Sequence, residues 1–160
     1  MLLLLIRHAQ AAEQSDTLYP DDTVRPLVPK GRKVQRRMSR ELRKRKLVPS
    51  RVFSSPWKRA WQTARVVVAE TGLPKRARLA CQALAGPPDL AALAGEIGEV
   101  GPDEIVALVG HEPWMSELAA LLLTGDRASP RIDFAKSAVM AIELDGWNAG
   151  SGTLRCFLVP

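Results

Sequence analysis

Residues 1–10, MLLLLIRHAQ, contain five consecutive aliphatic residues followed by an arginine and a histidine. A short, continuous apolar run of this kind predicts a β-strand that is buried on both faces, as in the middle of a parallel sheet. In open α/β sheets, ligands bind beyond the carboxyl ends of the strands. Arg7 and His8 follow such a strand and are therefore the first candidate functional residues.

Strand and helix patterns alternate along the rest of the chain. We expect strands at 50–55, 76–80, 103–110, 137–145 and 152–160, and helices at 30–46, 56–72, 87–98 and 112–125. Ser55 is expected to cap the second helix, with Pro56 at its first position. This order predicts a three-layer α/β/α sandwich around a mainly parallel sheet, in a single domain spanning 1–160.

Several classes of protein are disfavoured by the composition. The apolar start is interrupted by Arg7, far short of the ~20 residues that span a bilayer, and it lacks the features of a signal peptide. Cys81 and Cys156 have neither CxxC spacing nor a histidine placed to share a metal. We therefore expect reduced thiols in a cytoplasmic, monomeric protein, with no membrane segment, no metal and no cofactor.

Positive charge is concentrated in Lys30–Lys46, KGRKVQRRMSRELRKRK. This segment has ten Lys or Arg residues and one acid, a local formal charge of +9, whereas the whole chain carries +6. Val34, Met38 and Leu42 recur every four residues, which predicts an amphipathic helix with its charges in water. A solvated helix face is the simpler interpretation, and a docking surface for an acidic partner is the alternative. No aromatic residues are interleaved, so we expect no nucleic-acid partner.

The chain has two histidines, His8 and His111, and each follows a predicted buried strand. Residues at the ends of such strands meet at one edge of the sheet, so we expect the two imidazoles to share a pocket. Arg59 lies in the first turn of a predicted helix, where backbone N–H groups favour an anion. Arg25 lies in DDTVRPL, an irregular segment that we expect to be exposed.

Each of these residues alone has a plain structural interpretation. A loop arginine is usually a surface residue, and the Gly-His-Glu-Pro run is also compatible with a plain strand-to-helix turn. Together, three guanidinium groups around two imidazoles form a receptor for a tetrahedral phosphoryl dianion. The sequence therefore predicts a phosphate-binding site.

The same residues resemble the histidine phosphatase superfamily, which has a phosphoglycerate mutase-like fold, and within it the small SixA-type phosphohistidine phosphatases. The matching blocks occur in the family's order: LLIRHAQA, DDTVRPLVPKGR, VFSSPWKRAWQTA, IVALVGHEPWMSELAALLLTG and GTLRCFLVP. The resemblance implies a catalytic His8, a second histidine at His111, and phosphate-binding arginines at Arg7, Arg25 and Arg59. Arg7, Arg59 and His111 would act with His8 in catalysis, and His111 would also contact phosphate.

Two departures from the family pattern matter. Ala9 replaces the glycine of the usual Arg-His-Gly motif, which would carry a cost if its φ were positive. The segment 81–89, CQALAGPPD, has Gln82 and no carboxylate before Asp89, although relatives that hydrolyse phosphate esters usually have an acidic proton donor here. An alkoxide needs such a donor, whereas imidazole leaves phosphorus easily. This difference favours phosphohistidine on a protein partner as the substrate, with inorganic phosphate as the product.

Two alternatives stay open. One is a phosphomonoesterase that acts on a small metabolite, with Asp89, Glu112 or a group on the substrate as the acid. The other is a catalytically idle module that binds phosphorylated or acidic partners. Glu112 also has a simpler interpretation as a residue favoured by the dipole of the following helix.

Attack on phosphorus requires a neutral His8 held in one tautomer. We expect its second ring nitrogen to hydrogen-bond to a backbone carbonyl, and nearby arginines to disfavour the charged form. His111, if protonated in the complex, would stabilise developing charge as a hydrogen-bond donor.

Overall fold

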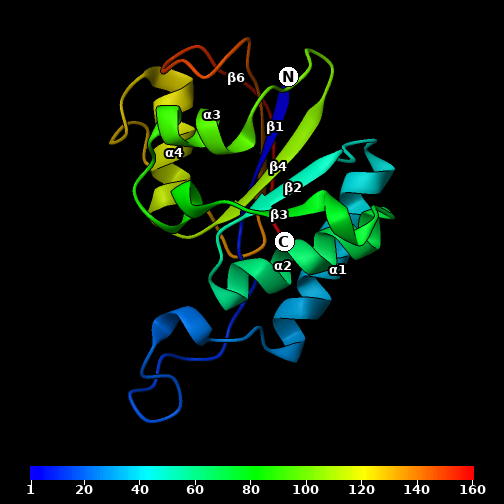
Figure 1. Ribbon diagram of the computed structural model, residues 1–160, viewed down its shortest axis with the longest axis vertical. Coiled ribbons are helices and arrows are strands. Elements are labelled where there is room, and N and C mark those ends of the chain that lie inside the picture. Colours follow the sequence, from blue (N-terminus) through cyan, green and yellow to red (C-terminus); the bar gives the residue numbers. More distant parts are fainter.

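A six-stranded sheet forms the centre of the molecule in the computed structural model, which describes all residues, 1–160 (Figure 1). The strands are β1 Leu2–Arg7, β2 Arg51–Ser54, β3 Arg78–Ala80, β4 Ile105–Gly110, β5 Val139–Glu143 and β6 Thr153–Leu158. Their order is β3-β2-β4-β1-β5-β6. Strands β3, β2, β4 and β1 pair in parallel, whereas β5 and β6 are antiparallel to their neighbours. The mainly parallel sheet is therefore confirmed.

Two pairs of helices cover the two faces of this sheet. The helices are α1 Pro29–Lys44, α2 Lys58–Thr71, α3 Leu90–Ile97 and α4 Trp114–Thr124. Helices α1 and α2 pack on one face, and α3 and α4 pack on the other. The short 3-10 helices are η1 Asp22–Val24, η2 Lys75–Ala77 and η3 Gln82–Ala85. The predicted three-layer α/β/α architecture is confirmed, and none of its helices has the length and apolar character needed to cross a bilayer.

Strand β1 has the two-sided burial that its sequence predicts. Leu3 and Leu5 pack into the core beneath α3 and α4, whereas Leu4 and Ile6 pack into the core beneath α1 and α2. All four side chains are fully buried. Alternate residues of a strand point to opposite faces, so a continuous apolar run joins the two halves of the core.

Helix α1 begins very close to the segment that follows β1. The N–H of Val28 donates to the carbonyl oxygen of Gln10 at 3.1 Å. A Cβ placed on Gly31 would lie only 2.1 Å from the same oxygen. Glycine at this position is what allows the helix to approach the backbone two residues beyond His8.

Helix α2 begins at Lys58, so the prediction that Pro56 occupies its first position was wrong. Ser55 accepts the N–H of Trp57 at 3.3 Å, but it lies before the helix and does not cap it as predicted. The Ser55 hydroxyl is also engaged by His111, and Trp57 keeps an extended backbone, so the chain turns once more before the helix starts. At its other end, α2 terminates at Gly72 in the left-handed conformation, as expected.

Candidate active site

The two histidines lie side by side at the carboxyl ends of adjacent parallel strands. Strands β1 and β4 pair with Arg7 opposite Gly110, so the residue that follows each strand is a histidine. The ring centroids of His8 and His111 are 5.2 Å apart, and both side chains are buried. The parallel register therefore brings together two imidazoles from distant parts of the chain.

His8 is held in a single tautomer. Its Nδ1 lies 2.8 Å from the carbonyl oxygen of Ala9, which can only accept, so Nδ1 carries the ring hydrogen. Its Nε2 accepts a hydrogen bond from Nε of Arg59 at 3.2 Å. Burial, together with the smaller effects of the Arg59 and Arg7 charges, lowers the pKa of His8 to about 3. The expected tautomer and direction of the pKa shift are both found, although burial contributes more than the arginines do.

Ala9 adopts the position of the usual glycine without strain. Its φ is not among the positive values in the chain, and its side chain is fully buried. Its N–H donates to the hydroxyl of Thr63 at 3.0 Å, which ties this turn to α2. The substitution therefore leaves the backbone around His8 intact.

His111 is fixed by Ser55, a residue that sequence reasoning did not place in the site. Nε2 of His111 lies 2.9 Å from Oγ of Ser55. Oγ of Ser55 accepts the N–H of Trp57, so the hydroxyl hydrogen of Ser55 is free to be donated to Nε2 of His111. An Nε2 that accepts this hydrogen bond favours the tautomer with the ring hydrogen on Nδ1. Nδ1 is buried and has no partner within the protein. Burial, with the positive charge of neighbouring groups, lowers the pKa of His111 to about 3, so both imidazoles are neutral.

The three predicted arginines converge on the same edge of the sheet. Arg7 donates from Nη1 to the carbonyl oxygen of Phe134 at 2.7 Å, and its Nε is buried without a partner. Arg25 donates to the carbonyl oxygen of Ala12 at 2.8 Å. Its side chain is only 18% exposed, so the expectation of an exposed segment was wrong at this residue. Arg59 is buried in the first turn of α2, as its sequence position predicts.

Asp22 was missed by sequence reasoning and is the main surprise of the site. Its carboxylate accepts from Nε of Arg25 at 2.6 Å and from Nη2 of Arg59 at 2.8 Å, and its carbonyl oxygen accepts from Nη1 of Arg59 at 2.7 Å. Burial raises the pKa of Asp22, but the two guanidinium groups outweigh this effect and hold it below its usual value. Its spacing of three residues from Arg25 was the one available signal. The carboxylate occupies donors that an incoming anion would need.

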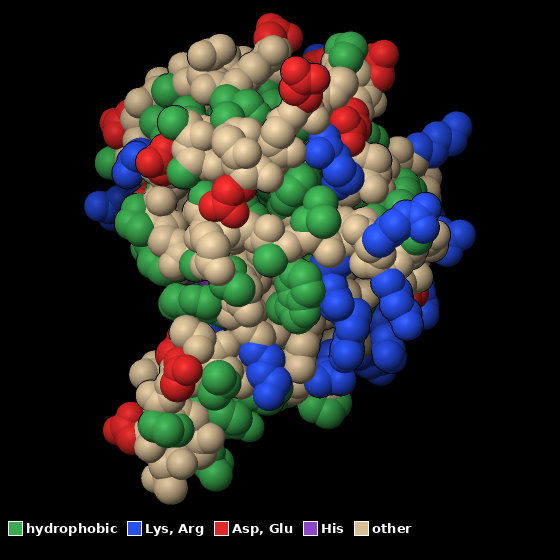
Figure 2. All heavy atoms as spheres, in the orientation of Figure 1, with side chains coloured by type: hydrophobic (Ala, Val, Ile, Leu, Met, Phe, Trp, Pro, Cys, Tyr) green, Lys and Arg blue, Asp and Glu red, His purple; other side chains and the backbone are tan.

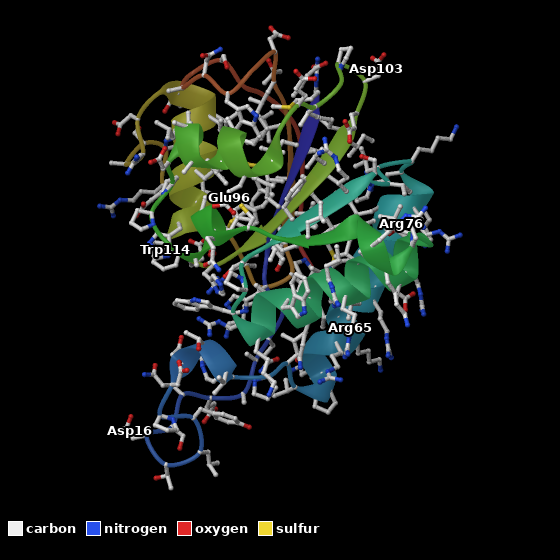
Figure 3. The ribbon with its side chains drawn as sticks, viewed as in Figure 1. Asp16, Arg65, Arg76, Glu96, Asp103 and Trp114 are labelled. Carbon is white, nitrogen blue, oxygen red and sulfur yellow. The ribbon has the colours of Figure 1, made fainter.

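These residues surround an open cleft of about 390 Å³. Trp57 lines it and lies against His111, with ring centroids 4.5 Å apart, and the guanidinium of Arg59 lies 4.7 Å from the ring centroid of Trp57. Trp114, at the start of α4 (Figure 3), also lines the cleft, as does Lys136. The segment that carries Asp16 projects from the body of the molecule beside this end of the sheet.

Only two carboxylates line the cleft, Asp22 and Glu112. Asp89 instead caps α3, where its side chain accepts the N–H of Ala92 at 3.0 Å. Glu112 accepts from the backbone and the hydroxyl of Ser116 at 3.1 and 2.6 Å, and burial raises its pKa. Because Asp89 is engaged at the start of α3, the segment 81–89 supplies no acid to the cleft.

No group of three or more His, Cys, Asp or Glu side chains is placed to hold a metal ion.

Comparison with known proteins identifies the family. The model of the histidine phosphatase superfamily (branch 1) matches residues 3–80, which include His8 and the three arginines. A protein of Picosynechococcus sp. is 30% identical over 144 residues, or 89% of this chain and 84% of the relative. The chain belongs to the histidine phosphatase superfamily.

The chain is also similar in structure, over nearly its full length, to solved proteins. The protein histidine phosphatase SixA, solved in complex with tungstate, has a TM-score of 0.79 and 29% identity over 100% of this chain and 97% of that chain. A mycobacterial glucosyl-3-phosphoglycerate phosphatase has a TM-score of 0.70 and 18% identity, over 99% of both chains. This hydrolase is therefore SixA-type, with the phosphoglycerate mutase-like fold that its sequence predicts.

Proposed function

We propose that this phosphatase removes the phosphoryl group from phosphohistidine on a protein partner, through a covalent intermediate on His8. The observation that carries the proposal is the state of His8: a neutral ring, with its hydrogen on Nδ1 and its lone pair on Nε2 among guanidinium groups. A neutral imidazole with a fixed lone pair is a competent nucleophile toward phosphorus. The likeness to SixA, a protein histidine phosphatase, supports the same reading.

The reaction has two displacement steps. Nε2 of His8 forms a bond to phosphorus while the P–N bond of the substrate breaks, and the substrate imidazole, which carries a hydrogen on its other nitrogen, leaves with the electron pair as a neutral ring. Water next attacks phosphorus while the P–Nε2 bond breaks and its electron pair returns to Nε2, and the proton that water loses passes to an oxygen of the released phosphate. The first step exchanges one P–N bond for another, so it needs no strong acid.

The surrounding residues bind and orient the phosphoryl oxygens. Arg7, Arg25 and Arg59 supply guanidinium donors, which bind such oxygens in pairs. A hydrogen on Nδ1 of His111, which the contact with Ser55 favours, would let this residue donate to a phosphoryl oxygen even when neutral. For Arg25 and Arg59 to bind the phosphoryl group fully, they exchange hydrogen bonds to the Asp22 carboxylate for bonds to the substrate.

The lack of an acid from segment 81–89 supports phosphohistidine over an ester. Proton donation to a poor leaving group contributes roughly 10²–10⁴ in rate, which an alkoxide needs and imidazole does not. Gln82 occupies part of this segment, and Asp89 is engaged at the start of α3. The proposed preference for phosphohistidine therefore rests in part on the absence of an acid from this one segment.

The proposal is tested by measuring kcat/KM for a phosphohistidine peptide and for the same peptide carrying phosphoserine. We expect the phosphohistidine value to be larger by at least about 10². His8→Ala should abolish turnover of both while preserving phosphate binding by the arginines. Comparable values for the two peptides, or turnover that survives His8→Ala, would overturn the proposal.

Glu112 favours a second candidate function, that of a phosphomonoesterase for a small metabolite. It lines the cleft, and its raised pKa holds more of it in the protonated, donating form. A related fold in the mycobacterial glucosyl-3-phosphoglycerate phosphatase shows that the scaffold accommodates ester chemistry. Glu112→Gln tests this candidate: a fall in kcat/KM for the phosphoserine peptide, with that for the phosphohistidine peptide unchanged, would show that Glu112 is the acid in ester hydrolysis. No change for the phosphoserine peptide would remove the support that Glu112 gives to the esterase.

A further inference from the structure

The outward face of α1 carries a row of exposed cations, which we call the basic stripe. Its members are Lys30, Lys33, Arg36, Arg37, Arg40, Arg43 and Lys44. Figure 2 shows Lys and Arg side chains gathered on this side of the molecule, over α1 and α2, and Figure 3 places Arg65 and Arg76 on the same side. The stripe follows sixteen residues of helix, a length of about 24 Å.

Few carboxylates neutralise the stripe. Glu70 pairs with Arg40 at 2.8 Å and with Arg36 at 3.7 Å, and Glu41 pairs with Lys44 at 3.8 Å. The stripe members with no ion pair include Lys30, Lys33 and Arg37, which stand three and four residues apart. Like charges at these spacings repel each other and destabilise a helix.

The packing of α1 against the sheet does not depend on the charged residues of the stripe. Met38 and Leu42 on the opposite face hold α1 against the sheet, and both are buried. A high density of one sign of charge speeds the association of oppositely charged partners. The stripe therefore has the properties of a binding surface in addition to those of a solvated helix face.

The first turn of α1 lies against the segment that follows His8. The first member of the stripe, Lys30, precedes Gly31, whose backbone lies against Gln10, two residues beyond His8. Helix α2 packs along α1 and carries Arg59 into the cleft. A macromolecule that places a phosphoryl group at His8 and extends past Gln10 would meet the first turn of α1.

We propose that the basic stripe docks an acidic surface of the phosphorylated protein beside its phosphohistidine, an inference that rests on the proposed function. A stable protein interface covers about 800 Å² on each partner, far more than a small cleft provides, so contacts outside the cleft are needed. Charge complementarity then selects an acidic partner and orients it along α1.

Two other polyanions fit the stripe less well. Helices that bind membranes bury an apolar face in the lipid, but the apolar face of α1 is already covered by the sheet, and the exposed large hydrophobic residues lie on other segments. Proteins that bind single-stranded nucleic acid stack bases on aromatic side chains, and the stripe contains none.

The test uses two phosphohistidine peptides, one followed by about twelve glutamates and the other by the same number of glutamines. Such a tail extends to about 40 Å, enough to follow α1 from the cleft. Lys33→Gln/Arg37→Gln removes two unpaired stripe charges. Arg127→Gln/Arg131→Gln, in the exposed loop between α4 and β5, is the control with the same change in net charge.

We expect the glutamate peptide to have a kcat/KM roughly tenfold above that of the glutamine peptide at low salt, through steering by the stripe. This preference should fall to about twofold in the stripe variant and in high salt, and persist in the control variant. Equal rates for the two peptides, or a preference that survives Lys33→Gln/Arg37→Gln, would overturn the docking proposal.

Binding measurements distinguish a failure of the docking proposal from a failure of the proposed function. If neither peptide is hydrolysed, the proposed activity fails, and fluorescence anisotropy of the unphosphorylated glutamate peptide then decides the docking proposal alone. Binding that weakens in the stripe variant supports docking, and absence of binding overturns it. Tighter, stripe-dependent binding of a single-stranded RNA of similar length would overturn the assignment to a protein partner.

Discussion

Asp22 occupies the place where a phosphate anion would meet two arginines. Its carboxylate contacts Arg25 and Arg59 and competes with the product for the same donors. We expect Asp22→Asn to tighten the binding of inorganic phosphate by about tenfold, because the charge-assisted hydrogen bonds to the carboxylate are lost. Isothermal titration with phosphate measures the effect, and Asp16→Asn, on an exposed residue of the same projecting segment, is the control. Weaker binding in Asp22→Asn would show that Asp22 chiefly positions the arginines.

The two buried imidazoles make the stability of the protein depend on pH. Burial is the main reason that the pKa of each falls from 6.5 to about 3, so both stay neutral in the folded state while the unfolded chain takes up protons below pH 6.5. The free energy of unfolding should therefore decline as pH falls from about 6.5 to about 3, by about 1 kcal/mol per histidine at pH 5.5. The raised pKa of Glu112 acts in the opposite direction.

Urea unfolding at pH 7.5 and 5.5 measures this decline. His8→Gln removes one of the two titrating groups, so its own decline over the same range should be about half as large. A wild-type free energy of unfolding that does not change between these pH values would contradict the neutral, buried state of the imidazoles.

At the scale of an element, the contact between α1 and Gln10 is the most sensitive to substitution. A methyl group on Gly31 would meet the Gln10 carbonyl oxygen, so Gly31→Ala must push the helix from the turn that follows His8. We expect a loss of about 1–3 kcal/mol in the free energy of unfolding, as for other overpacked sites. The matched control is Gly95→Ala in α3, where nothing lies within 4 Å and a gain of about 0.5–1 kcal/mol is expected. Thermal or urea unfolding compares the two, and equal effects would contradict the close approach.

Elements with strong periodicity were predictable from the sequence, and the details of turns were not. The apolar runs that end at His8 and His111 located β1 and β4, because burial on both faces leaves a continuous pattern. The start of α2 was misplaced by two residues, because the hydroxyl of Ser55 is engaged by His111, a contact that local sequence does not reveal. The fold of the segment around Asp22 and Arg25 was also hidden, because it has no repeating pattern and is positioned by Arg59 from another element.

At the scale of the whole molecule, the parallel pairing of β1 with β4 creates the site. It places one histidine after each strand, while α2 aims Arg59 at Nε2 of His8 from one side. The concentration of charge on α1 was visible in the sequence, but its position beside the cleft required the fold. The architecture thus places the proposed phosphoryl site at the end of the sheet where the strongly basic helix α1 begins.

The most direct test of this chemistry is to quench the reaction with a phosphohistidine peptide and locate the phosphate on the protein by mass spectrometry. If Nε2 of His8 is the nucleophile, an acid-labile, base-stable phosphate appears on the peptide that contains His8, and the His8→Ala variant shows none. Turnover at the normal rate with no phosphate on His8 at any quench time, or with phosphate on another residue, would contradict covalent catalysis by His8.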